Sequence, residues 1–220
     1  SFHDPGRSRF YFDTRSSGVR LRLKTLTGQG KIDVTFGEYR YRFSPTVFSQ
    51  INASIVPLLI SRVHYLLSPF AASHLVDLYC GYGLFTHALA SSFAHVIGIE
   101  ANGESAHAAI ENGKFNKTAD KTRIYVARIS RGTVTNCLSK VNCHPEFFFC
   151  DPPRQGMDPF AITETCARRP EKVVLACCGT DAIPEQVAAF KRGGYKLKYA
   201  ESLDMFPGTP HLETLLAFGQ

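Results

Sequence analysis

The sequence predicts an α/β fold built on a mainly parallel sheet, and three observations lead to it. Between residues 70 and 220, short apolar runs of strand length alternate with segments of helical apolar spacing. Polar or turn residues directly follow several of these runs, as at the carboxyl ends of parallel strands. The last two runs, Tyr195–Tyr199 and Leu212–Phe218, have no helix between them, so we expect them to pair antiparallel.

Residues 1–43 precede this alternation and predict a small β attachment. Apolar and cationic residues alternate over Val19–Lys24 and Tyr39–Phe43, which is typical of half-buried strands with one cationic face. Residues 1–42 hold nine Lys or Arg and four acids, so they carry five of the chain's six net positive charges. Such a face can contact RNA phosphates, although an ordinary solvated face has the same pattern.

Residues 44–220 form the second predicted domain, which opens with a helical segment. The apolar spacing predicts a helix over Val47–Leu67. Pro57 lies within it, lacks an amide hydrogen and clashes with the preceding turn of a helix. We therefore expect Pro57 either to kink this helix or to start a second one.

Residues 75–90 have the pattern of a nucleotide-binding turn. An apolar strand over Leu75–Leu78 leads to Gly81 and Gly83, and a helix is predicted over Leu84–Ala90. Glycine lets the backbone approach a ligand closely and adopt positive φ. This pattern favours a bound nucleotide-like cofactor.

The identity of that cofactor is narrowed by two residues. Glu100 follows the next predicted strand, His95–Ile99, where nucleotide-binding units place an acid that accepts hydrogen bonds from ribose hydroxyls. A dinucleotide fingerprint has a third glycine where this chain has Thr86. We therefore expect a nucleoside-containing cofactor without a pyrophosphate. Two ordinary covering helices are predicted over Ala106–Phe115 and Ala161–Arg168.

Asp151 follows the apolar run Phe147–Cys150, which has the length and composition of a buried parallel strand. Pro152 and Pro153 cannot continue a strand, and they hold the departing chain extended. Asp151 is thus predicted on stiff backbone at the edge where α/β sheets bind ligands. Taken alone, the segment would also fit a plain Asp-Pro turn.

Cys178 and Glu213 are predicted at the same edge. The strand Val173–Ala176 ends in two adjacent cysteines, a helix follows over Ile183–Phe190, and Glu213 stands at the beginning of the last strand. A buried cysteine is more often an inert small hydrophobe than a nucleophile. Because polar groups from four strand ends converge on one rim, we interpret them as a functional site.

Composition restricts the class of protein. An apolar content of 44% supports a packed core. The seven cysteines lack metal-ligand spacing, so we expect no metal, and their usage is typical of a reducing compartment. No run of membrane-spanning length and no signal peptide is present. We expect no membrane partner and a cytoplasmic location, with nuclear or organellar residence left open.

Several motifs together resemble the RNA 5-methyluridine methyltransferases, enzymes that use S-adenosylmethionine (SAM) to methylate uracil in tRNA or ribosomal RNA. The resemblance covers about residues 43–220, and the combination of DPPR with the final FPxTxHxE pattern makes it specific. It implies a Rossmann-like methyltransferase fold, with residues 1–43 as the remnant of a β-rich central domain. The matching segments are FSQIN at 48–52, DLYCGYGLFT at 77–86, GIE at 98–100, DPPRQG at 151–156, Cys178, and DMFPGTPHLE at 204–213.

The resemblance also implies roles for individual residues. Cys178 would be the nucleophile that adds to C6 of uracil, and Glu213 the base that removes the C5 proton. Asp151 and Gln50 would position the uracil or SAM. The remaining SAM-binding residues would be Gly81, Gly83, Glu100, and Tyr79 or Tyr82. The function implied is transfer of a methyl group from SAM to C5 of a uridine in RNA through a covalent cysteine adduct.

Four positions depart from the family pattern. Gly179 and Thr180 replace the usual Asn-Pro after the nucleophile, Gly113 replaces a usual alanine, and Arg128 stands where an acid usually lies near the adenine. A cation cannot accept a hydrogen bond from the adenine amino group. Two alternatives therefore stay open: a catalytically impaired RNA-binding relative, and a SAM-dependent methyltransferase with another acceptor. The oligomeric state is not indicated by the sequence.

Overall fold

The computed structural model describes residues 9–13, 22–27, 30–50, 52–70, 72–139, 141, 146–205, 207–209 and 212–220. Cys143, Ile51 and three residues of the last motif (Phe206, Pro210 and His211) lie outside these residues. So do residues 14–21, and with them part of the Val19–Lys24 segment. Within the described part of the chain, no helix is long and apolar enough to cross a membrane.

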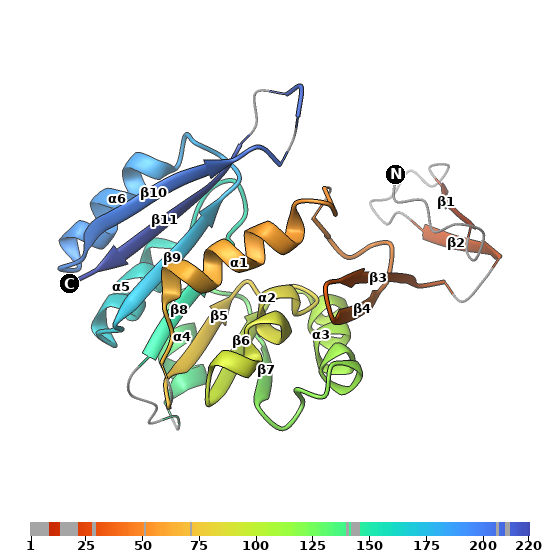
Figure 1. Cartoon of the computed structure of the whole chain (residues 1–220), viewed down its shortest axis with the longest axis horizontal. Helices are drawn as coiled ribbons and strands as arrows, with labels where there is room; N and C mark the ends of the chain where they lie inside the picture. Colours follow the sequence, from red (N-terminus) through yellow and green to blue (C-terminus); the bar gives the residue numbers. More distant parts are fainter. Residues whose placement is uncertain are drawn as a thin grey trace.

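A seven-stranded sheet forms the centre of the molecule (Figure 1), in the order β10-β11-β9-β8-β5-β6-β7. Neighbours from β9 to β7 pair in parallel, whereas β11 pairs antiparallel with both β9 and β10. The predicted fold class is therefore confirmed, including the antiparallel ending. The strands are β5 (His74–Leu78), β6 (His95–Glu100), β7 (Thr122–Val126), β8 (Glu146–Cys150), β9 (Lys172–Cys177), β10 (Lys196–Leu203) and β11 (Glu213–Gly219).

Helices cover both faces of this sheet, because side chains alternate between the faces along each strand. On β8, Phe147 and Phe149 pack into the cluster shared with α1 (Val56–Leu67) and α2 (Leu84–Ala88). Phe148 and Cys150 pack on the opposite face, into a second cluster. The helices of that second cluster are α4 (Thr133–Leu138), α5 (Pro159–Ala167) and α6 (Ile183–Arg192). α3 (Gly103–Phe115) contributes Ala108 to the first cluster.

The helix predicted over Val47–Leu67 begins nine residues later than expected, at Val56, so this prediction was wrong for its first part. Pro57 occupies the first turn of α1, where its missing amide hydrogen costs nothing. Its role is thus to start a helix rather than to kink one. The described residues from Val47 to Ile55 form turns and irregular backbone, which crosses to the carboxyl edge of the sheet.

Two β-hairpins precede the sheet. One pairs β1 (Arg9–Asp13) with β2 (Arg22–Thr27), and the other pairs β3 (Ile32–Phe36) with β4 (Tyr39–Phe43). The predicted alternation is confirmed in β4, where Tyr41 and Phe43 are buried and Arg40 is exposed.

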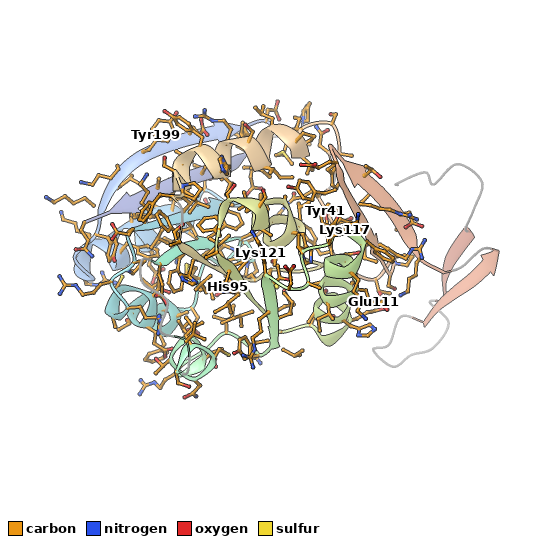
Figure 2. All side chains as sticks on the ribbon, turned by 60° about the horizontal axis from the view of Figure 1, so that its bottom comes forward. Tyr41, His95, Glu111, Lys117, Lys121 and Tyr199 are labelled. Atoms are coloured by element: carbon orange, nitrogen blue, oxygen red, sulfur yellow. The ribbon has the colours of Figure 1, made fainter. Side chains whose placement is uncertain are left out.

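The β3–β4 hairpin packs firmly on the larger domain, next to α3 (Figure 1). Tyr41 is fully buried between hairpin and helices (Figure 2), and its hydroxyl donates to the carbonyl of Leu84 at 2.8 Å. The amides of Arg40 and Arg42 donate to the side chains of Asn116 and Asn112. The boundary between residues 43 and 44 stays a prediction, since this hairpin shares the core of the domain that follows it.

The cations of β4 are engaged within the protein. The guanidinium of Arg42 makes two hydrogen bonds of 2.9 Å to the carboxylate of Asp33, and Arg40 contacts the same carboxylate at 3.4 Å. Both guanidinium groups also lie over the ring of Phe115. The predicted cationic face is therefore partly neutralised by Asp33.

Candidate active site

A cavity of about 970 Å³ lies at the carboxyl ends of the parallel strands, which is within the usual size of small-molecule sites. The antiparallel β11 contributes to the same edge because its first residue lies where the parallel strands end. Seven of the eight residues predicted for the site line this cavity: Gln50, Tyr79, Gly81, Glu100, Asp151, Cys178 and Glu213. Gly83 does not line it. Tyr82, the alternative to Tyr79 in the sequence analysis, also lines the cavity.

The turn between β5 and α2 gives the cavity part of its wall. Gly81 has a φ of +57°, and its amide donates to Glu100 at 3.0 Å. Gly83, with a φ of +86°, precedes α2, and a Cβ there would lie 2.6 Å from the ring of His87. Glycine at 83 therefore serves close packing of the turn on α2, while Gly81 presents its backbone to the cavity.

Glu100 is held in a fixed orientation at the end of β6. One carboxylate oxygen accepts from the amide of Gly81, and the other accepts from the amide of Asn102 at 2.7 Å. Each carboxylate oxygen has a second lone pair, so the side chain can still accept hydrogen bonds from a ligand. A pair of ribose hydroxyls would suit this acceptor.

Asp77 is a cavity residue that the sequence reasoning missed. Its Oδ2 accepts from the hydroxyl of Thr86 at 2.5 Å, while its buried Oδ1 has no hydrogen-bond partner among the described residues. Burial raises the pKa of this carboxyl to about 7. The signal was an acid inside the apolar strand His74–Leu78, since a buried acid needs a partner. A ligand with a hydrogen-bond donor or a positive charge fits this unpaired oxygen.

Asp151 lies at the end of β8, as predicted. Its amide donates to Leu78 at 3.3 Å, which continues the β5–β8 pairing by one residue before Pro152. Its carboxylate accepts from the side-chain amide of Gln50 at 3.4 Å. Burial raises the pKa of Asp151 to about 7.

Cys178 and Glu213 complete the opposite end of the cavity. Glu213 is buried, and its Oε1 has no hydrogen-bond partner among the described residues. Burial, and then the negative charge of Asp151, raises the pKa of Glu213 to about 8. Burial also raises the pKa of the half-buried Cys178 thiol, and Glu213 and Asp151 raise it further, whereas Arg154 lowers it. The arrangement can supply a nucleophile and a base to one bound molecule.

The two adjacent cysteines differ in their surroundings. Cys178 lines the cavity. Cys177 ends β9 and is buried in the cluster beneath α5 and α6, away from the cavity lining. Only Cys178 of this pair is thus placed for chemistry in the cavity.

Comparison with known proteins identifies the family. The model of the tRNA (Uracil-5-)-methyltransferase family matches residues 11–218. The chain belongs to this family. Its curated relatives include a 23S rRNA (uracil(1939)-C(5))-methyltransferase RlmD of Nitrosococcus oceani, 31% identical over 84% of this chain and 41% of the relative. RlmD of Burkholderia pseudomallei is 29% identical over 99% of this chain and 48% of the relative.

Solved structures agree in fold. A Pyrococcus abyssi tRNA (uracil-54, C5)-methyltransferase, in complex with S-adenosyl-L-homocysteine, superposes with a TM-score of 0.76 at 23% identity. The match covers 96% of this chain and 50% of that one. M. jannaschii TYW2, in complex with AdoMet, gives a TM-score of 0.59 at 17% identity, with 90% of both chains covered. The fold is therefore the Rossmann-like fold of SAM-dependent methyltransferases. The chain spans about 40% of the length of the first curated relatives it matches.

One departure from the usual pattern of uracil-5-methyltransferases has a structural reason. A Cβ at Gly179 would lie 3.2 Å from the carbonyl oxygen of Arg154, which is tighter than ordinary contact. The loops after β8 and β9 approach each other at this point. The β8 loop is also tied to α6, because the side chain of Gln186 accepts from the amide of Met157 at 3.0 Å. Glycine after Cys178 thus lets the two loops pack together beside the cavity.

Proposed function

We propose that the chain is the catalytic part of an RNA methyltransferase that transfers a methyl group from SAM to C5 of a uridine. The observation that carries this proposal is that Cys178, Glu213 and Asp151 line a single cavity together with the nucleoside-type turn after β5. Membership of the uracil-5-methyltransferase family supports it.

The cavity fits the ribose and the methionine part of SAM in its donor and acceptor pattern. Glu100 would accept from the ribose hydroxyls, and Gly81 lets the backbone approach closely. The unpaired Oδ1 of Asp77 would accept from the ammonium group of the methionine part. When bound, SAM supplies a sulfonium methyl group, which is an electrophile.

The cavity is long enough for cofactor and base together. Four strand spacings separate β7 from β9 in the sheet, or about 19 Å at the usual distance between neighbouring strands. The nucleoside-type turn serves β5 and β6, which leaves the end at β8, β9 and β11 for the acceptor. A uridine within folded RNA would have to swing out of its stack to enter there.

Cys178 would act as the nucleophile. Carbon C5 of uracil is a weak nucleophile until a thiolate adds to C6 and places electron density on C5. In the ligand-free protein, the raised pKa of Cys178 keeps the group largely as a thiol near neutral pH. The thiol must therefore lose its proton as substrate binds, and the positive charge of Arg154 favours that loss.

Glu213 would remove the C5 proton, after which the thiolate leaves and the ring regains its double bond. Its raised pKa makes its carboxylate form a stronger base than an exposed carboxylate, although most of the group is protonated near neutral pH in the ligand-free protein. Asp151, held by Gln50, would orient the uracil ring through its polar edge. RNA is the partner proposed, in the form of tRNA or ribosomal RNA.

The proposal is tested by incubating the chain with methyl-labelled SAM and unmodified tRNA and rRNA transcripts, followed by digestion and identification of the labelled nucleoside. Label in 5-methyluridine is expected. Cys178→Ala should lower the rate about a thousandfold or more, as removal of a nucleophile does. Cys177→Ala is the matched control and should keep most of the activity.

Covalent chemistry has its own test. RNA with 5-fluorouridine at the target carries no C5 proton, so the adduct should persist as a protein–RNA complex that survives denaturation. The complex should form with the unaltered chain and be absent with Cys178→Ala. Methyl transfer that is insensitive to both Cys178→Ala and Glu213→Gln would instead select another acceptor. SAM binding without methyl transfer to any transcript would favour an impaired relative.

A further inference from the structure

Arg128 is the second residue after β7, at the end of the cavity opposite Cys178. The amide of Ala127 donates to the carbonyl of Glu100 at 2.8 Å, so the pairing of β6 with β7 continues past the end of β7. This places the backbone of Arg128 beside the end of β6. Both Glu100 and Arg128 line the cavity.

The backbone of Arg128 is fixed while its guanidinium is uncommitted. Its carbonyl accepts from the hydroxyl of Thr133 at 2.8 Å, and Ile129, the next residue, is buried. The side chain itself is exposed, and its guanidinium makes no hydrogen bond or ion pair with the described residues. In contrast, Arg131 lies over the ring of Phe160 at 4.0 Å and is not part of the cavity lining. Arg128 is thus available to a ligand.

The ligand group beside Arg128 follows from the ribose position at Glu100, and this step rests on the proposed function. A nucleoside whose ribose is bound at Glu100 extends its base toward the end of β7. A guanidinium has five hydrogen-bond donors and no acceptor. It cannot bind the 6-amino group of adenine, but it can donate to the ring nitrogens.

Other polar groups near this end already make hydrogen bonds within the protein. Each oxygen of Glu100 accepts from one backbone amide, and its second lone pair is the one assigned above to the ribose. The side-chain oxygen of Asn102 accepts from two amides at the start of α3, and Asp158 uses one of its two oxygens in the same way at the start of α5. Arg128 therefore adds an uncommitted donor to the base end of the cavity, where the second oxygen of Asp158 is the competing acceptor.

We propose that Arg128 recognises the acceptor edge of the purine, so that the cavity accepts a 6-oxopurine nucleoside at least as well as adenosine. A 6-oxopurine presents O6 and N7 side by side, and this is the pair of acceptors that arginine binds with two hydrogen bonds. Adenine offers N7 or N1 alone to the same guanidinium. Arg128 is then the residue that sets the base specificity of the cofactor site.

The experiment compares two probes, S-adenosylhomocysteine and S-inosylhomocysteine, by isothermal titration calorimetry. The unaltered chain should bind the inosyl compound as tightly as the adenosyl compound or more tightly. Arg128→Asp replaces the donor by an acceptor, so the ratio of the two dissociation constants should shift about tenfold or more toward the adenosyl compound. Arg128→Gln, which can donate and accept, should give an intermediate ratio. Arg131→Gln is the matched control and should leave the ratio unchanged.

The outcomes separate this inference from the proposed function. The unaltered chain could bind the adenosyl compound tightly and the inosyl compound only weakly, with the same ratio in Arg128→Asp. That result would overturn the inference alone, and Asp158 would then be the residue that accepts from the amino group. Binding of neither probe would overturn both the inference and the proposed cofactor. Because Arg128 is exposed, a thermal unfolding midpoint within the range of the control variant shows that a changed ratio does not come from a changed fold.

Discussion

The side-chain amide of Gln50 donates to the carboxylate of Asp151 at 3.4 Å, joining two segments that are 101 residues apart in the sequence. Gln50 is buried and belongs to the irregular segment before α1, while Asp151 ends β8. The orientation of an acid in the cavity thus depends on a segment outside the sheet. Gln50 is a positioning residue on this view.

The first prediction concerns that contact. Gln50→Leu removes the only donor seen on the Asp151 carboxylate among the described side chains, and we expect kcat/KM for RNA methylation to fall about three- to tenfold. Gln50→Glu should cost more, because a second acid raises the pKa of Asp151 further and moves the pH profile upward. Steady-state kinetics across pH measure both effects. Ser54→Ala, in the same segment, is the control, and a Gln50→Leu enzyme with unaltered kinetics and pH profile would contradict the assigned role.

The second prediction concerns the reactivity of Cys178. Arg154 lowers the pKa of this thiol, against burial and the two acids, which raise it. Arg154→Gln should therefore raise the pKa of Cys178 and slow its alkylation by iodoacetamide at any pH below that pKa. Mass spectrometry of the peptide that contains Cys178 follows the reaction separately from the other cysteines. Arg131→Gln is the control and should leave the pH profile of Cys178 alkylation unchanged. An unchanged profile in Arg154→Gln would show that the charge of Arg154 does not act on the thiol.

Much of the site could be predicted because its residues follow strands that are recognisable in the sequence as short apolar runs. Asp151, Cys178 and Glu100 each follow a continuous apolar run, and the topology rule then brings such positions to one edge. Gly81 was located by the turn that it requires. The cavity therefore follows from local pattern and one general rule of α/β sheets.

The features that were not predicted from the sequence depend on contacts or on short elements. The apolar spacing after Val47 is that of a helix, but Pro57 is favourable only in a first turn, so the helix begins at Val56. α4 was not predicted, because it is only six residues long and has too few apolar positions to show periodicity. The alternation within β4 correctly predicted that Tyr41 faces inward, but it could not show that Tyr41 packs on distant helices. Asp77 was missed because its partner Thr86 lies on the following helix.

The third prediction links Asp77 to the pH dependence of stability. The pKa of this carboxyl is about 7 in the folded protein, against 3.8 for the unperturbed group, so the folded state holds the proton more tightly. The resulting stability is present in full below about pH 4 and is lost as pH rises through 7. Asp151 and Glu213, whose pKa values are also raised, act in the same direction.

Asp77→Asn mimics the protonated acid and can still accept from Thr86. The unfolding free energy of the unaltered chain should fall between pH 4 and pH 8. In Asp77→Asn this fall should be smaller by on the order of 2–4 kcal/mol. Urea unfolding at several pH values measures it. Asp120→Asn, at an exposed position, is the control. Equal slopes for the unaltered chain and Asp77→Asn would show that folding does not raise the pKa of Asp77.

The last prediction concerns a buried ion pair far from the cavity. Glu146 opens β8 and is fully buried, and both of its oxygens accept from the guanidinium of Arg168, one of them from Nε at 2.7 Å. Arg168→Leu leaves a buried carboxylate without its cation, so the unfolding free energy should fall by about 3–5 kcal/mol. The exposed pair of Lys31 and Glu111 provides the contrast, because Lys31→Met should cost at most about 1 kcal/mol.

The double variant Glu146→Gln with Arg168→Leu separates charge from packing. If the loss in Arg168→Leu comes from the uncompensated charge, neutralising Glu146 should restore most of the stability, since an amide costs far less to bury than a carboxylate. Denaturant unfolding of the four proteins of this cycle gives the coupling free energy directly. Additive losses would mean that the aliphatic part of Arg168, the C-cap residue of α5, contributes the stability instead.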